Sequence, residues 1–140
     1  MSENLVLNNL VCFNFYIGWK QIVSIYKEVL GNDVSPQKVY VLETCDPEEK
    51  ITVWEVARKI GLDSSAISTM IARMEKAGLV FRTHDLEDRR QVFVQLTADG
   101  VRFRAQLREK YLELTERINR DMTGQEISIL KDITSKLTTN

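Results

Sequence analysis

One stretch, residues 63–96, constrains the fold of this chain more than any other part of the sequence. Its first half carries apolar residues three and four positions apart, the spacing of an amphipathic helix, at Ala66, Ile67, Met70, Ile71 and Met74. Gly78 follows at a position where a left-handed residue often ends a helix. Segments 80–83 and 92–96 are rich in β-branched residues and predict two antiparallel strands. We therefore predict a helix followed by a β-hairpin.

The opposite face of this predicted helix is short-chained and polar, with Ser64, Ser65, Ser68, Thr69 and Arg73. The predicted hairpin loop, HDLEDRR, ends in the adjacent arginines Arg89 and Arg90. A helix with a small polar face can enter the major groove of DNA, while a basic hairpin reaches a neighbouring groove. We predict that these side chains contact duplex DNA. The alternative is an ordinary solvated helix face beside solvated loop charges.

The preceding segment supplies a partner for the predicted DNA-contacting helix. Thr52 is well placed as an N-cap for a helix over 53–60, and Gly61 and Leu62 form a tight turn before the next helix. Helix, glycine-containing turn and helix form a helix-turn-helix, and the hairpin makes it a winged one. Pro36 predicts the start of a further helix to about residue 45, and 50–52 can add a short strand. The winged helix-turn-helix is thus expected over about 36–96.

Long helices are predicted on both sides of this unit. Residues 4–30 are apolar around most of a helix circumference, which requires burial on several sides. A helix is expected over 97–121, followed by a break and a last helix to 139 that begins with Thr123 and Glu126 as a capping box. These segments, 4–30 and 97–139, contribute little obvious core to the winged unit. We expect them to form a homodimer, whose two DNA-contacting helices would read a pseudo-palindrome about 34 Å apart.

Composition fits a single domain over residues 1–140, mainly α-helical with one small antiparallel hairpin. The chain is 44% hydrophobic and 28% charged, which indicates a globular protein. A net charge of −1 argues mildly against a nucleic-acid partner, although basic residues gather at the predicted contacts. No apolar run could span a membrane and no secretory signal is visible, so a cytoplasmic protein is expected. Catalytic, cofactor and metal motifs are also lacking, so we expect no enzyme.

Residues 62–100, LDSSAISTMIARMEKAGLVFRTHDLEDRRQVFVQLTADG, resemble the core of the MarR family of winged-helix regulators. The matching features are the LDSS start, the MEKAGLV helix exit, the acid and arginine of the wing, and the LTxxG closing segment. The resemblance implies an obligate dimer with intertwined terminal helices. It also implies transcriptional repression relieved by a small ligand or by oxidation. By position, Arg90 resembles an arginine inserted into the minor groove, and Asp88 the acid that orients it.

The N-terminal segments LVCFNFY, IYKEVL and VSPQKVYVL are similar to the organic-hydroperoxide-sensing OhrR branch of that family. This similarity implies that Cys12 is the peroxidatic cysteine and that Tyr16 and Tyr26 hydrogen-bond to it. Tyr16 lies one helical turn from Cys12 on the same face. Tyr26 lies fourteen residues on, about 21 Å along a helix axis. It could therefore approach Cys12 only across an antiparallel dimer.

Plainer interpretations stay open for several residues. Cys12 can be a small apolar filler in a buried helix, and Tyr16 and Tyr26 can be interface aromatics. We expect Cys45, Trp19 and Trp54 to have structural roles. Two further functions also remain, namely a repressor gated by a small aromatic ligand and a winged helix used for protein–protein contact. Loss of a peroxide response in Cys12→Ser would separate the first from a thiol switch, and salt-sensitive binding to duplex DNA would exclude the second.

Overall fold

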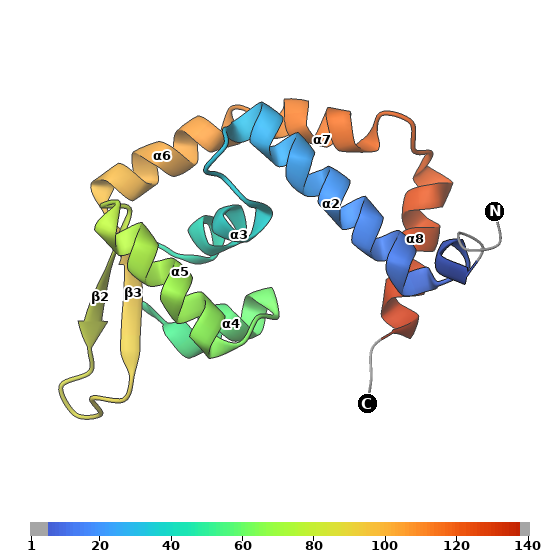
Figure 1. Cartoon of the computed structure of the whole chain (residues 1–140). Coiled ribbons are helices and arrows are strands. Elements are labelled where there is room, and N and C mark those ends of the chain that lie inside the picture. The colour runs from blue at the N-terminus through green and yellow to red at the C-terminus, as the bar shows by residue number, and fades with distance from the viewer. Residues whose placement is uncertain (1–5, 138–140) are drawn as a thin grey trace.

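The computed structural model of the protein describes residues 6–137 (Figure 1). Positions 4, 5, 138 and 139 of the predicted flanking helices lie outside these residues. In chain order the elements are α2 (Val11–Leu30), α3 (Pro36–Thr44), β1 (Ile51–Thr52), α4 (Val53–Ile60), α5 (Ser64–Lys76), β2 (Val80–His84), β3 (Val92–Leu96), α6 (Ala98–Arg108), α7 (Tyr111–Asn119) and α8 (Gly124–Lys136). The prediction of a mainly helical chain with a small antiparallel sheet is confirmed.

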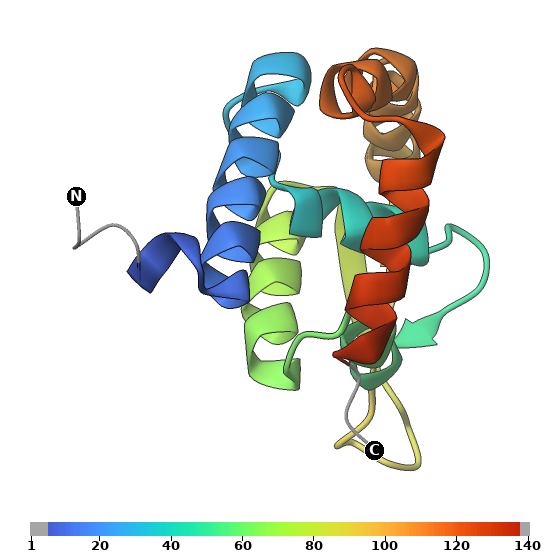
Figure 2. The same ribbon diagram turned by 90° about the vertical axis from the view of Figure 1, so that its right-hand side faces the viewer.

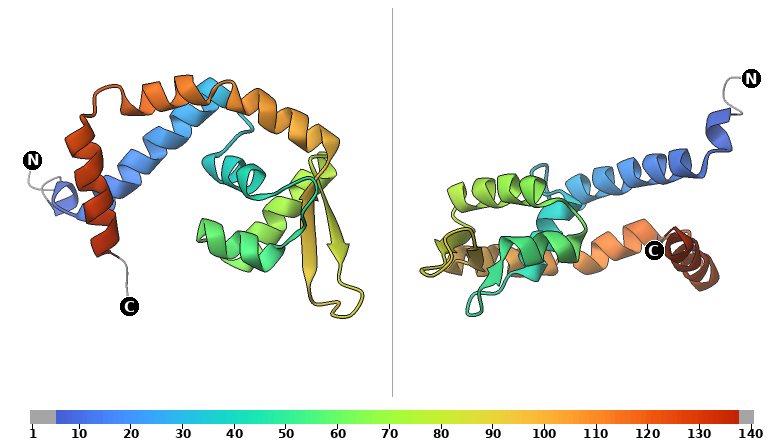
Figure 3. Two further views of the ribbon diagram at one scale, coloured as in Figure 1. Left: turned by 180° about the vertical axis from the view of Figure 1, so that it is seen from behind. Right: turned by 90° about the horizontal axis from the view of Figure 1, so that it is seen from below.

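The elements form two regions. We call α3, α4, α5 and the three strands the winged lobe, and α2, α7 and α8 the helical arm; α6 leads from one to the other (Figure 1). The hairpin lies at one end of the molecule, and α8 and the start of α2 lie at the far end of the arm. Figure 2 views the molecule from that far end and shows α2 and α8 as two separate helices. The views from behind and from below show the same division (Figure 3).

The sheet of the winged lobe has three antiparallel strands in the order β1-β3-β2. β2 and β3 form the predicted hairpin, in which Arg82 pairs with Val94. β1 pairs Ile51 with that same Val94 from the other side, so the short strand that the sequence allowed is present. Because β1 runs directly into α4, this pairing fixes the start of the helix-turn-helix against the base of the wing.

Polar caps set the bounds of the two helices of the helix-turn-helix. The Thr52 side chain accepts a hydrogen bond from the backbone N–H of Glu55 at 3.0 Å, which confirms it as the N-cap of α4. Asp63 caps α5 in the same way through the N–H of Ala66, at 2.7 Å. Gly61 and Gly78 end α4 and the turn after α5 with positive φ angles of 83° and 81°, conformations that favour glycine.

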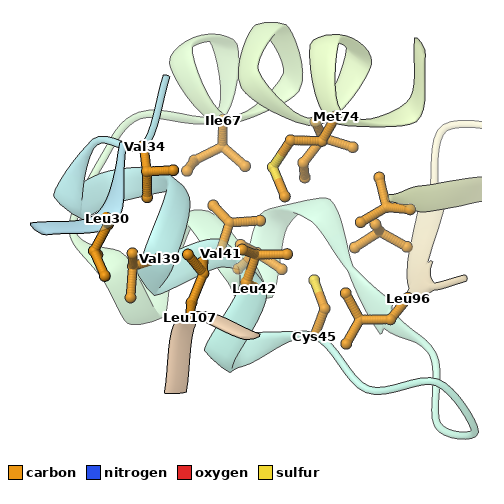
Figure 4. Close-up of a cluster of buried hydrophobic side chains, with 14 of the residues drawn as sticks. Leu30, Val34, Val39, Val41, Leu42, Cys45, Ile67, Met74, Leu96 and Leu107 are labelled. Atoms are coloured by element: carbon orange, nitrogen blue, oxygen red, sulfur yellow. The ribbon is translucent and has the colours of Figure 1, made fainter. Parts of the chain in front are cut away.

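The hydrophobic core lies in the winged lobe and reaches toward the arm (Figure 4). Ile67, Ile71 and Met74 of α5 point into it, and Met70 is half-buried beside them, so these four residues of the predicted apolar face are the inner side of the helix. Ala66, the fifth residue of that predicted face, is exposed. Cys45 is 2% exposed within this core, as expected for a structural residue. Burial raises the pKa of its thiol to about 11, which keeps Cys45 protonated and unreactive at neutral pH.

The LTxxG segment closes the lobe through backbone contacts. The Thr97 hydroxyl donates to the carbonyl of Gly78 at 2.6 Å, and the Thr97 N–H donates to the carbonyl of Leu79 at 3.0 Å. The same hydroxyl accepts from the N–H of Gly100 at 2.9 Å and so caps α6. A Cβ atom on Gly100 would overlap the Leu79 carbonyl oxygen. Glycine is therefore required here by the close approach of α6 to the end of the α5–β2 turn.

The prediction of one continuous helix over 97–121 was wrong. It is divided at Glu109 and Lys110 into α6 and α7. The N–H of Lys110 bonds to the carbonyl of Leu107 at 2.9 Å, a tight three-residue turn of the 3₁₀ type. The two halves have different partners, because α6 packs on the winged lobe and α7 packs along α2. No proline or glycine marks this break, so the sequence gives no signal of it.

Two further expectations about the flanking helices need correction. The long first helix begins at Val11 rather than at residue 4, since the chain turns at Leu10 after a short helical turn at 6–8. The flanking helices also contribute more core than predicted, with buried Tyr26, Val29, Leu30, Leu107 and Leu114. These residues lie where α2, α6 and α7 meet the lobe, so only the far part of the arm is without core contacts of its own.

Candidate nucleic-acid interface

The predicted polar face of α5 is exposed along its whole length. Burial of the opposite face directs this one outward, and the exposed side chains are those of Ser64, Ser65, Ser68, Thr69 and Arg73. The Thr69 hydroxyl donates to the carbonyl of Ser65 one turn earlier, at 3.1 Å. Its oxygen keeps acceptor capacity for an outside donor. The face therefore offers short hydroxyl groups at its start and a cation near its end.

The wing loop holds Arg90 in a defined place although the side chain is 93% exposed. The Asp88 carboxylate accepts from the Nε of Arg90 at 3.2 Å and from its backbone N–H at 3.1 Å. Asp85 and Gln91 close the loop, because the N–H of Asp85 donates to the carbonyl of Gln91 at 3.0 Å. Contact between Asp88 and Arg90 agrees with the orienting role that the resemblance implied. One edge of the guanidinium is used, and the other nitrogens point to solvent.

A groove of about 720 Å³ joins the helix face to the wing. Its lining combines the start of α4, the start of α5, β2 and the end of the wing loop: Thr52, Val53, Trp54, Glu55, Arg58, Ser64, Ser68, Arg82, Arg90, Gln91 and Val92. Among the predicted contact residues, Ser64, Ser68 and Arg90 are thus brought together.

Arg89 is not part of that groove, although it is adjacent to Arg90 in the sequence. It lines a separate hollow at the tip of the wing with His84, Asp85 and Leu86. The two arginines therefore face different parts of the surroundings. Sequence adjacency did not reveal this difference, because both arginines lie in a turn that the N–H of Gln91 closes onto the carbonyl of Asp88 at 2.9 Å.

Three groove residues were missed from the sequence: Trp54, Arg58 and Arg82. Trp54 was expected to be a packing residue with a structural role, but it is 59% exposed in the chain. In α4 the buried positions are Val53, Val56 and Ala57, so the helical spacing places residue 54 on the outer side. That spacing was a usable signal, and the usual preference of tryptophan for burial hid it.

Arg82 fixes the wing relative to α5. Its Nε and Nη2 both donate to Oε1 of Glu75, at 3.0 and 2.8 Å, and its backbone N–H donates to Oε2 at 3.0 Å. The Arg82 side chain holds the pKa of the Glu75 carboxyl below its usual value. Glu75 lies near the end of α5 and Arg82 in β2, so this contact joins the two elements that would meet DNA.

The residues proposed to sense oxidation lie at opposite ends of α2. Cys12 is exposed near its start, and Tyr16, one turn on, is exposed with the Lys20 ammonium 5.4 Å from its ring centre. Tyr26 is buried where α2 meets the lobe, beside Tyr40, and burial raises its pKa to about 12. The structure therefore does not bring Cys12 and Tyr26 of one chain together, as their separation along a helix required.

None of the helices over 6–137 is long and apolar enough to cross a membrane. In the same range, no three metal-ligating side chains come together.

Known proteins resemble this chain in both sequence and fold. A model of the MarR family matches residues 34–92. The organic hydroperoxide resistance transcriptional regulator of Bacillus subtilis is 32% identical over 114 residues, which cover 80% of this chain and 74% of the relative. This chain belongs to the MarR family. Its members are transcriptional regulators, and this confirms the expectation that the chain is not an enzyme.

Solved structures of MarR-type proteins confirm the winged-helix fold. The PcaV transcriptional regulator of Streptomyces coelicolor, in complex with its natural ligand, superimposes with a TM-score of 0.85 at 18% identity, over 94% of this chain and 93% of that one. A mutant MarR from E. coli, complexed with operator DNA, gives a TM-score of 0.78 at 22% identity, over 89% and 91% of the chains. The family and fold together make the chain a DNA-binding transcriptional regulator.

Proposed function

We propose that this MarR-family regulator is a homodimeric repressor of a pseudo-palindromic operator, and that oxidation of Cys12 releases it from DNA. The observation that carries the DNA-binding part is the shared groove. Ser64 and Ser68 of α5 line it together with Arg90 of the wing. One duplex can therefore meet the helix face and the wing arginine at the same time.

In the proposed complex α5 lies in the major groove and the wing reaches an adjacent minor groove. Ser64, Ser65, Ser68 and Thr69 have hydroxyls short enough to meet base edges or phosphates closely, and Arg73 provides a cation. Arg90 enters the minor groove, where the negative potential of narrow A·T-rich segments attracts a guanidinium. Asp88 already holds Arg90 in place, so less side-chain freedom is lost on binding. Arg89, on the other side of the wing, contacts a flanking phosphate.

The helical arm supports the homodimer. It exposes large apolar side chains, and none of the residues of α8 is buried. The exposed set on the arm and just before it is Val6, Leu7, Leu10, Val11, Tyr16, Ile17, Trp19, Leu112, Met122, Ile129, Leu130, Ile133 and Leu137. A monomer rarely leaves so many apolar side chains together in water, and such patches mark association surfaces. A second copy of the chain is the proposed cover.

The thiol switch adds the chemistry of Cys12. Its thiolate attacks the O–O bond of an organic hydroperoxide, and one oxygen is transferred to sulfur while the other leaves as the alcohol. The sulfenic acid then condenses with a small thiol, giving a mixed disulfide and water. Cys45 is buried, so an internal bridge to it is not expected. Tyr16, and Tyr26 of the second copy, are the proposed hydrogen-bond partners of Cys12.

Two observations support the switch. The Cys12 side chain is exposed within one chain, so no packing inside a single copy shields it from a hydroperoxide. The B. subtilis relative carries organic hydroperoxide resistance in its name. A thiol near the dimer contacts is also placed so that an added group would alter the fit of the two arms.

The test is binding of the reduced protein to its own upstream DNA, before and after one equivalent of an organic hydroperoxide, with Cys12→Ser in parallel. We expect the wild type to release the DNA and Cys12→Ser to stay bound. Cys45→Ser is the matched control and should respond like the wild type. If Cys12→Ser is also released, Cys12 is not the sensor.

Retention of DNA by both wild type and Cys12→Ser would favour the alternative, a repressor gated by a small aromatic ligand. No binding to duplex DNA at any salt concentration would instead favour a winged helix that contacts proteins. A steep fall in DNA affinity with rising salt is the expected result, because phosphate contacts release counterions.

A further inference from the structure

We propose that Trp54 and Arg58 of α4 form a seat for the sugar–phosphate strand that separates the two DNA grooves. This inference rests on the proposed DNA binding and adds to it two residues that the sequence analysis did not assign to DNA contact. Trp54 would pack on the deoxyribose, and Arg58 would contact a phosphate beside it. Both are exposed and both line the groove between α5 and the wing.

The position of the groove supports this assignment. Its lining joins Ser64 and Ser68 of α5, Arg90 and Gln91 of the wing, and the start of α4. If α5 occupies the major groove and Arg90 the adjacent minor groove, one backbone strand must run between α5 and the wing. That strand would follow the groove and meet residues 52–58. The first helix of a helix-turn-helix is the element that crosses the DNA backbone in other proteins.

The chemistry of Trp54 fits a backbone strand. Its side chain is 59% exposed, and water solvates such a large apolar surface poorly. The flat indole can cover the apolar face of a deoxyribose, and its only polar atom is an N–H donor suited to a phosphate oxygen. These contacts do not depend on base identity.

Arg58 is already held beside the indole. The central carbon of its guanidinium lies 5.5 Å from the centre of the Trp54 ring, within the range of a cation–π contact. Stacking of this kind uses the flat face of the guanidinium and leaves its edge nitrogens free to donate to a phosphate. The pair is therefore arranged before DNA arrives.

The charges of the groove lining favour an anionic occupant. Arg58, Arg82 and Arg90 face one acid, Glu55. That carboxylate accepts from the Thr52 hydroxyl at 3.1 Å at the start of α4. Arg82 is paired with Glu75, and Arg90 keeps free donors beyond its contact with Asp88. Arg58 forms no ion pair with any residue over 6–137, so Arg58 and the free donors of Arg90 are the groups open to a phosphate strand.

Fluorescence of Trp54 gives a direct test. The chain has two tryptophans, so Trp19→Phe leaves Trp54 as the single indole reporter. The probe is a labelled duplex of the chain's own upstream region, whose anisotropy records binding independently. On binding we expect a blue shift of Trp54 emission and weaker quenching by acrylamide. Unchanged emission and quenching, with anisotropy showing full binding, would overturn the seat.

Charge substitution gives a second, independent test. Arg58→Gln should make the dependence of log K on log salt less steep, reducing the magnitude of the slope by about one. It should also weaken binding to specific and random duplexes alike. Lys59→Gln is the matched control, because Lys59 is an exposed cation on the same helix that does not line the groove. Equal effects of the two substitutions would overturn the assignment of Arg58.

Removal of the indole completes the test. Trp54→Ala should reduce affinity by roughly threefold to tenfold on both duplexes, with little change in salt slope, since an apolar contact releases no counterion. Failure of the wild type to bind any duplex would overturn the proposed function together with the seat. Binding that is weakened by Arg90→Ala but not by Trp54→Ala or Arg58→Gln would overturn the seat alone.

Discussion

The winged lobe and the helical arm expose different kinds of side chain to solvent. In the lobe the apolar side chains of α5 are buried, and the exposed face of that helix is polar and basic. In the far part of the arm, large apolar side chains are exposed among the polar ones, and α8 buries none of its own residues. A stable unit with a polar outer face suits a charged partner. A helix pair with an uncovered apolar face suits a partner that supplies apolar surface in return.

Polar contacts hold the boundary between the two regions, in addition to the buried side chains of α2 and α6. Arg108 of α6 donates to Glu43 of α3 through Nε at 3.0 Å and Nη2 at 2.8 Å, and the Tyr111 hydroxyl donates to the same carboxylate at 3.2 Å. Arg104 donates to the carbonyl of Cys45 at 3.0 Å, at the end of α3. In the proposed homodimer, these contacts would connect the packing of the two arms to α3 of the winged lobe.

The largest expected effect is in the lobe, at Gly100. Gly100→Ala places a Cβ against the Leu79 carbonyl oxygen, a backbone atom that cannot move aside cheaply. We expect the free energy of unfolding to fall by about 3 kcal/mol or more, measured by urea denaturation. Gly124→Ala in the arm is the control, since a Cβ there has open space around it. Equal stability of the two variants would contradict the close packing of α6 on the lobe.

The next effect concerns the arm. Leu130→Asp puts a charge on the exposed apolar face of α8 and should raise the dimer dissociation constant by roughly 30-fold, about 2 kcal/mol, in sedimentation equilibrium. Ser128→Asp, also exposed on α8, should leave dimerisation nearly unchanged. The helical content should be similar in both variants. A monomeric wild type would show that the arm is covered by something other than a second copy.

A smaller effect is expected in the wing. Arg90→Ala should weaken DNA binding by about 1–3 kcal/mol without changing the free energy of unfolding, because the Arg90 side chain is almost fully exposed. Asp88→Asn should weaken binding less, since it removes only the contact that orients Arg90. Arg102→Ala, an exposed arginine on α6, serves as the control in the same titration. Full affinity in Arg90→Ala would remove the wing from the proposed complex.

The smallest effect is at the boundary and depends on pH. Hydrogen bonding from Arg108 lowers the pKa of the Glu43 carboxyl below its usual 4.5. The contact therefore stabilises the fold fully above pH 4.5 and loses its contribution as the pH falls through the lower folded-state value. Glu43→Gln should cost about 1 kcal/mol or less at pH 7, because both side chains are partly exposed.

This difference between wild type and Glu43→Gln should shrink in acid, as measured by thermal denaturation across pH. Glu116→Gln, exposed on α7, provides the control. A difference that grows in acid would show that Glu43 stabilises the fold as the neutral acid instead.

The lobe was also easier to predict from sequence than the arm, for a physical reason. Its bounds depend on local signals, such as the caps Thr52 and Asp63 and the positive φ of Gly78, which a sequence displays directly. The break at Glu109 and Lys110 follows from tertiary contacts on either side of it, and no proline or glycine marks it in the sequence. The helical period of the apolar residues continues through such a break. Periodicity alone therefore predicts one helix where the structure has two.

The candidate site shows the same limit. The polar face of α5 and the contact of Asp88 with Arg90 were predictable from spacing and from resemblance. The exposure of Trp54 followed from helical spacing but was hidden by the usual burial of tryptophan. The separation of Arg89 from Arg90 and the contact of Arg82 with Glu75 depend on the folded loop and hairpin, which the sequence does not specify in that detail.

Hydroxyl-radical footprinting of the wild type on its own upstream DNA tests the central claim most directly. Two winged lobes joined by their arms should protect two patches about 34 Å apart, each flanked by protection of a minor groove. Arg90→Ala should lose the minor-groove protection and keep the rest. A single protected patch, or a pattern that Arg90→Ala leaves unchanged, would contradict a dimer that reads DNA with α5 and the wing.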